Sequence, residues 1–282
     1  MINFLNFLAE DLHPELFDIL DSNTDIHSKH KKITQHIRKL IANGIDTGLE
    51  GERAKKGSSR AVYFPKEEKE INIDGKKAKI KTALKIAFPG ILDKPQFIKK
   101  AGMLGELQNN AEASEYFNDH SILKKGMYNN EFVTNEEHGI LAPIINTSHD
   151  DSWLEMGKVN NITSKKFRQL TKTESHPEGL NHTAVEDILF NEHRLKYGQG
   201  RQEYTSEEQA VLNHPFTQKL MHLIENTDIH PGDIFGGGIT PGNNFGVWTH
   251  PHTGKEYPVI RDYGFTDSVA KEYIKRRRQI NE

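Results

Sequence analysis

The spacing of apolar residues changes twice along this 282-residue chain, which restricts the folds that it can form. Residues 1–45 have the spacing of amphipathic helices, and residues 46–159 are dominated by the two-residue alternation of strands. Residues 160–282 return to helical spacing, with one predicted β-hairpin. Strand runs followed by helix runs predict an α+β fold with two lobes. We therefore expect an N-terminal helical extension, a lobe with an antiparallel sheet and one helix, and a short helical lobe.

Local signals place the individual elements. Ile33, Ile37 and Leu40 share one helix face, and Gly44 follows as a helix end. Alternating apolar residues flank the dipeptide Asp74-Gly75, which is typical of two-residue hairpin turns. Further strands are expected over 57–64, 81–88, 139–145 and 152–159, with helices over about 102–118, in KKFRQL, AVEDILF and SEEQAVL, and from Pro215.

Composition narrows the possible partners. The chain has 37 Lys and Arg against 40 Asp and Glu, a net charge of −3, which argues against general nucleic-acid or membrane-surface binding. It has no cysteine, which excludes disulfides, thiolate nucleophiles and Cys-ligated zinc. No apolar run approaches the roughly 18 residues of a membrane span, and the segment MINFLNFLAEDLHPE lacks the basic start of a secretory signal. We expect no membrane partner, and a location inside a cell or within a larger particle.

Phosphoryl transfer needs phosphate neutralisation, metal ligands and a positioned nucleophile, and several segments could supply them. The backbone amides of Gly57, Ser58 and Ser59 open a strand and could contact phosphate oxygens. Lys85 lies within the apolar strand ALKIA, where burial requires an anionic partner. Glu112, on the predicted helix that follows, is a candidate for that anion. Glu106 on the same helix is its competitor.

Two candidate metal ligands lie at the beginning and at the end of the predicted C-terminal hairpin. Asn244 in NNFGVW begins it, and Asp262 in VIRDYGF ends it. Amide and carboxylate oxygens are hard ligands that suit Mg²⁺. Asn243 competes with Asn244 for this role, and Asp262 has the alternative role of a turn residue.

In this order and setting, these segments resemble the protein-kinase-like fold over about residues 46–265. ALKIA is similar to the family's VAIK strand, RDYGF to its DFG motif, and NNFGV to the stretch with the second metal ligand. WLEMGKV looks like the hinge, with Leu154 in the gatekeeper place, which implies that backbone groups of Glu155, Met156 and Gly157 contact an adenine ring.

The resemblance also implies roles for the polar residues. Lys85 would bind the α/β-phosphates of ATP, Glu112 would pair with Lys85, and Asn244 and Asp262 would hold Mg²⁺. The family places a catalytic Asp five residues before its metal-binding Asn, a place that Gly238 takes here when counted from Asn243. Asp233 is the nearest substitute and becomes the candidate catalytic residue, although it requires a longer loop.

Two classes of function remain open. The first is a phosphotransferase that uses ATP and Mg²⁺ to phosphorylate a hydroxyl. The second is a kinase-like structural or interaction protein without catalysis, whose partners are other phage structural proteins, because the short lobe resembles small bacterial and phage kinase-like proteins. The H-x-H pair His250 and His252 raises a metal-hydrolase alternative, but no H-E-x-x-H motif accompanies it and it falls in a predicted hairpin turn.

Overall fold

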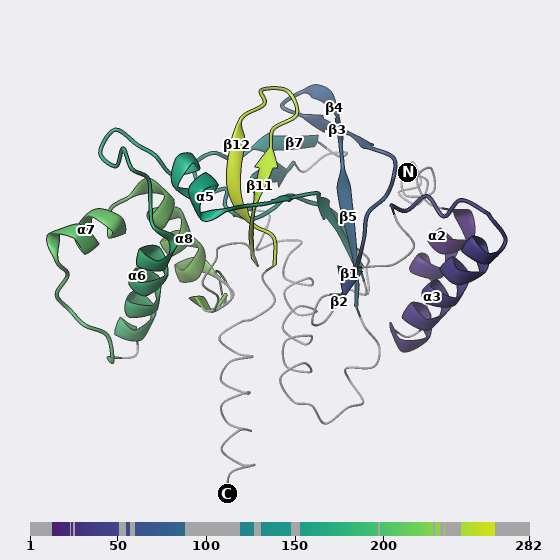
Figure 1. The fold of residues 1–282 in the computed structure, drawn as a ribbon, viewed down its shortest axis with the longest axis horizontal. Helices are drawn as coiled ribbons and strands as arrows, with labels where there is room; N and C mark the ends of the chain where they lie inside the picture. The colour runs from purple at the N-terminus through teal and green to yellow at the C-terminus, as the bar shows by residue number, and fades with distance from the viewer. Residues whose placement is uncertain are drawn as a thin grey trace, which may run out of the picture.

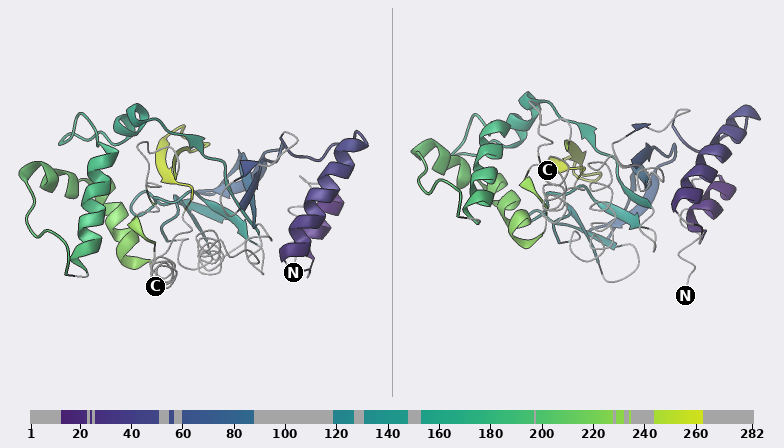
Figure 2. Two further views of the ribbon diagram at one scale, coloured as in Figure 1. Left: turned by 60° about the horizontal axis from the view of Figure 1, so that its bottom comes forward. Right: turned by 90° about the horizontal axis from the view of Figure 1, so that it is seen from below.

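The computed structural model describes residues 13–22, 24, 26–50, 55–56, 60–87, 119–126, 131–147, 153–196, 198–227, 229–231, 234 and 244–262. Over these ranges the fold is α+β, as expected, and its strands form three sheets. Figure 2 shows the sheets in the middle of the molecule, with the N-terminal helices at one end and the later helices at the other.

The central sheet has five strands in the order β1-β2-β5-β9-β8, and all neighbours are antiparallel. Figure 1 labels β1, β2 and β5 of this sheet. These strands are β1 (Lys55–Lys56), β2 (Arg60–Tyr63), β5 (Thr82–Ala87), β8 (Ile144–Thr147) and β9 (Trp153–Gly157). Lys85 pairs with both Val62 and Leu154, and Ala83 pairs with Met156. Because side chains alternate along a strand, Lys85, Ala83 and Met156 lie on one face of the sheet.

The N-terminal helices pack on the opposite face of this sheet. The helices are α2 (Pro14–Asp21) and α3 (Ile26–Ala42). Their buried apolar residues form one core cluster with residues of β2, β5 and β9: Leu16, Leu20, Ile33, Ile37 and Leu40 meet Ala61, Tyr63, Leu84, Ile86 and Trp153. The expected helix end is also present, since Gly44 has a φ of +67°.

A second sheet has the order β4-β3-β7-β6. Its strands are β3 (Lys69–Ile73), β4 (Lys76–Ile80), β6 (Leu123–Lys125) and β7 (Glu131–Thr134). The predicted β3–β4 hairpin is confirmed, and its turn residues Asp74 and Gly75 have φ values of 51° and 74°. However, β3 and β7 pair in parallel, so the strands of this region are not all antiparallel. Sequence patterns did not predict β6 or β7.

The third sheet and the helices that follow β10 contribute buried residues to one shared hydrophobic core cluster. Strand β10 (Asn160–Asn161) pairs with β11 (Phe245–Thr249), which forms the predicted hairpin with β12 (Glu256–Ile260). The helices are α5 (Ser164–Leu170), α6 (His182–Leu195), α7 (Ser206–Leu212) and α8 (Pro215–Asn226). Thr205 and Glu208 form a capping box at α7, which explains where this helix begins. Phe167, Phe216 and Phe245 bring α5, α8 and β11 together in one aromatic cluster.

One predicted strand begins later than expected. Residues 139–145 were expected to be extended, but the regular strand β8 begins at Ile144. Leu141 instead makes isolated bridges to Ser121 and Ile260. Pro143 lacks a backbone N–H and cannot donate to a ladder, which limits regular pairing before β8. The helix expected over 102–118 lies outside the described residues.

Among the helices that the structure describes, none is both long and apolar enough to cross a membrane.

A candidate ligand-binding site at Lys85 and Asp262

A cavity of about 340 Å³ opens on the Lys85 face of the central sheet. Its volume falls within the usual range of small-molecule sites, roughly 300–1,000 Å³. Its walls come from β2, β5, β9, the segment that leads into β10, and the end of β12. The lining residues are Val62, Phe64, Ala83, Lys85, Met156, Gly157, Lys158, Val159, Asn160, Asn161, Arg261 and Asp262.

Lys85 is held near the end of β12. Its side chain is 14% exposed. Its Nζ donates a hydrogen bond to the carbonyl oxygen of Arg261 at 2.8 Å and lies 3.4 Å from Oδ1 of Asp262. A lysine in the middle of a sheet therefore has an anionic partner, as its burial requires, and among the described residues this partner is Asp262. The pairing of Lys85 with Glu112 stays a prediction. Glu112 and its competitor Glu106 lie outside the described residues.

The two predicted metal ligands lie at the same end of the β11–β12 hairpin. Phe245 pairs with Ile260, and the next backbone contact is a hydrogen bond from the N–H of Arg261 to the carbonyl oxygen of Asn244 at 2.7 Å. This contact pairs Asn244 with Arg261, the residue that precedes Asp262. Asn244 is buried, whereas the side chain of Asp262 is 48% exposed. The Asp262 carboxylate can therefore be reached from the cavity.

Met156 and Glu155 differ in their relation to the cavity. Met156 lines it, but Glu155 does not. Because Glu155 pairs with Leu84, it belongs to the opposite face of the sheet, where its carboxylate contacts Nζ of Lys69 at 2.5 Å. The side chain of Glu155 is thus a structural group, and the adenine contact expected from its backbone stays a prediction.

Two backbone amides of the predicted hinge, those of Gly157 and Lys158, already donate hydrogen bonds within the protein. The N–H of Gly157 donates to the carbonyl oxygen of Pro143, and the N–H of Lys158 donates to that of Lys81, both at 2.8 Å. A ligand that enters the cavity therefore has to find its hydrogen-bond partners among other groups of the lining.

Sequence analysis missed four polar residues of the cavity, Lys158, Asn160, Asn161 and Arg261. Nη1 of Arg261 donates to Oδ1 of Asn161 at 2.7 Å. Burial lowers the pKa of the Arg261 guanidinium, and the neighbouring Asp262 partly offsets this effect. Lys158 contacts the carboxylate of Glu50 at 2.8 Å and lies over the ring of Phe64. Arg261 is adjacent to a predicted metal ligand, and this adjacency was the one sequence signal that could have identified it.

Several predicted site residues lie outside the described residues. These are Gly57, Ser58, Ser59 and Asp233, together with Asn243. The structure does describe the strands on both sides of the first group, because Lys56 of β1 pairs with Ala61 of β2.

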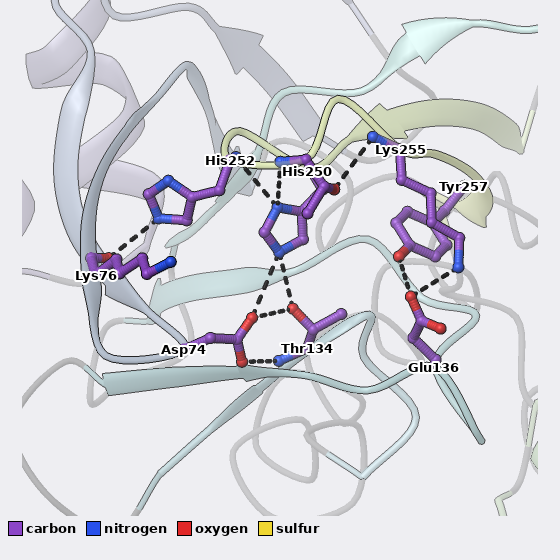
Figure 3. A network of polar contacts seen from close by, with 9 residues as sticks. Asp74, Lys76, Thr134, Glu136, His250, His252, Lys255 and Tyr257 are labelled. Carbon is purple, nitrogen blue, oxygen red and sulfur yellow. Dashed lines mark hydrogen bonds and ion pairs between the residues drawn. The ribbon is translucent and has the colours of Figure 1, made fainter.

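The histidine pair in the β11–β12 turn belongs to a structural network (Figure 3). Nδ1 of buried His250 accepts the backbone N–H groups of His252 and Thr253 at 3.2 and 3.4 Å. This assigns the proton to Nε2, which lies 2.9 Å from Oγ1 of Thr134. The Thr134 hydroxyl in turn donates to Asp74 at 2.6 Å. Among the residues that the structure describes, no three His, Asp or Glu side chains are grouped to hold a metal ion, so the metal-hydrolase alternative gains no support.

Comparisons of the chain with models of protein families and with curated proteins found no match. The function of this site is therefore inferred from the geometry of the cavity.

Proposed function

We propose that this chain is a protein-kinase-like phosphotransferase that binds ATP and Mg²⁺ at Lys85 and Asp262 and transfers the γ-phosphoryl group to a hydroxyl. The observation that carries the proposal is the contact between these two residues at the wall of the cavity, 3.4 Å apart although they come from distant parts of the chain. Phosphoryl transfer relies on positioning and electrostatic stabilisation, and a lysine beside a carboxylate can supply both.

The lining divides into an apolar and a charged part, as a nucleotide requires. Val62, Ala83 and Met156 present apolar side chains from three neighbouring strands. These side chains can contact the flat surface of a purine. Lys85 of β5 reaches Asp262 just after β12, and the phosphates would then be placed at this contact. In this arrangement Lys85 exchanges part of its contact with Asp262 for a contact with phosphate oxygens.

Asn244 and Asp262 fit a magnesium site by their chemistry. Both have hard oxygen atoms, both lie at the same end of the β11–β12 hairpin, and the Asp262 carboxylate is half exposed. Bound Mg²⁺ would neutralise charge on the phosphate chain. Asp233, which precedes Asn244 in the chain, is the proposed base that orients the acceptor hydroxyl and takes its proton.

Calorimetric titration with ATP, with and without Mg²⁺, tests the binding step. We expect Lys85→Ala to weaken binding by about 1.5–3 kcal/mol, the usual contribution of a hydrogen bond to a charged group. Lys79→Ala is the matched control, because Lys79 is an exposed lysine of β4 that does not line the cavity. Failure of the wild-type protein to bind ATP would refute the proposal.

Turnover distinguishes an enzyme from a protein that only binds nucleotide. We expect wild type to release ADP from ATP in the presence of hydroxyl acceptors, and Asp233→Ala to lose this activity while it still binds ATP. Binding without turnover or autophosphorylation across a panel of acceptors would instead favour the non-catalytic interaction protein, for which a phage particle is the proposed setting.

A further inference from the structure

The backbone of Arg261 is fixed at both of its polar groups. Its N–H donates to the carbonyl oxygen of Asn244 at 2.7 Å, and its carbonyl oxygen accepts a hydrogen bond from Nζ of Lys85 at 2.8 Å. Arg261 therefore cannot move independently of the lysine and the hairpin that define the site. Any ligand that contacts Lys85 must also lie close to Arg261.

The side chain of Arg261 is held by a residue that is far away in the sequence. Nη1 donates to Oδ1 of Asn161 at 2.7 Å, and Asn161 belongs to β10, which pairs with β11 through Gly246. Both Arg261 and Asn161 line the cavity. A side chain anchored in this way loses less conformational entropy when it binds a ligand than an unanchored arginine would.

The charged lining of the cavity favours anions. It contains three cations, Lys85, Lys158 and Arg261, and one carboxylate, Asp262. Lys158 already has a carboxylate partner in Glu50, which does not line the cavity. Arg261 and Lys85 are consequently the two cations placed around the exposed carboxylate of Asp262.

We infer that Arg261, positioned by Asn161, is a second phosphate-binding cation beside Lys85, and that it makes the site prefer ligands with a polyphosphate chain over monophosphates. A guanidinium presents several N–H donors in one plane, which matches phosphate oxygens better than a neutral group does. The inference rests on the proposed nucleotide binding.

The test is the ratio of affinities for ATP and AMP, each measured calorimetrically with Mg²⁺. In Arg261→Gln we expect ATP affinity to fall about tenfold or more and AMP affinity to fall much less, so that the ratio decreases by about tenfold. Asn161→Ala should lower the same ratio by a smaller factor, because the guanidinium remains but loses its anchor. Arg261→Lys keeps the charge without the planar donors and should fall between wild type and Arg261→Gln.

The controls separate this inference from the proposed function. Arg201→Gln changes an exposed arginine that pairs with Glu208, so it should leave the ATP:AMP ratio unchanged. If wild type binds ATP but the Arg261 variants keep the wild-type ratio, the inference is wrong and the proposed function stands. Equal losses for ATP and AMP would assign Arg261 a purely structural role. If wild type binds neither nucleotide, both proposals are wrong.

Discussion

Lys69 and Glu155 form an ion pair 2.5 Å long in which the side chains are only 2% and 3% exposed. The pair joins β3 of the second sheet to β9 of the central sheet. Taking two charges out of water is costly, and the cost is offset only while both partners are present. The contact therefore couples the two sheets through a pair of mutually dependent residues.

Removal of one partner should lower the free energy of unfolding much more than removal of both partners. We expect Lys69→Met to lower the free energy of unfolding by about 3–5 kcal/mol, because it leaves the Glu155 carboxylate buried without its lysine. The double variant Lys69→Met/Glu155→Leu should recover most of this loss. Urea denaturation measures both effects.

The control for this pair is an exposed ion pair of the β3–β4 hairpin, to which Lys69 also belongs. Lys77 and Glu70 lie 2.7 Å apart on the surface of the β3–β4 hairpin. Water screens such pairs, so Lys77→Met should leave the unfolding midpoint close to that of wild type. A similar loss in Lys69→Met and Lys77→Met would show that burial of the Lys69–Glu155 pair is unimportant.

Acid should destabilise the fold through His120. Burial, followed by the nearby His222, lowers the pKa of His120 to about 4, and the charge of His138 acts in the same direction. The unfolded state therefore binds a proton at higher pH than the folded state does. Stability from this group is complete above about pH 6.5 and is lost as the pH falls towards 4, by roughly 3 kcal/mol in total.

Unfolding measurements between pH 7 and pH 4 check this expectation. His120→Gln removes the titrating group, so its free energy of unfolding should depend less steeply on pH than that of wild type. His252→Gln is the control, because His252 is an exposed histidine of the β11–β12 turn. An identical pH dependence in wild type and His120→Gln would exclude His120 as the source.

Asp262→Asn should reduce the effect of Mg²⁺ on nucleotide binding. The substitution keeps the shape of a half-exposed side chain but removes the charge that a hard cation needs. We expect a smaller rise in melting temperature with Mg²⁺ and ATP than in wild type, because the stabilisation by a ligand increases with its affinity. Asp187→Asn, at an exposed position of α6, should retain the full rise. Equal shifts in all three proteins would leave Asp262 only its role beside Lys85.

The N-terminal helices should contribute to the stability of the body. Ile33 is 2% exposed in the cluster that α2 and α3 form with the central sheet, so Ile33→Ala should cost about 2–5 kcal/mol. Ile45 is 45% exposed, and Ile45→Ala should have little effect. Limited proteolysis gives a second measurement: rapid removal of the first 44 residues from an otherwise intact protein would contradict this packing.

Sequence patterns determined those features that depend on neighbouring residues. The Asp74-Gly75 turn could be predicted because few residues adopt positive φ, and the start of α7 could be predicted because Thr205 and Glu208 satisfy the first backbone N–H groups of the helix. The burial of Lys85 in an apolar strand also indicated that it must have an anionic partner. Each of these inferences uses residues within one turn or one strand.

Only the tertiary structure decided which distant groups meet. Lys85 contacts Asp262, Arg261 contacts Asn161, and Lys69 contacts Glu155 across two sheets. No local pattern could separate the strands into different sheets or predict the parallel pairing of β3 with β7. These contacts depend on how the whole chain closes its loops and buries its apolar faces. The free-energy cost of loop closure and the gain from apolar burial involve distant residues, so the spacing of residues along any one segment does not determine them.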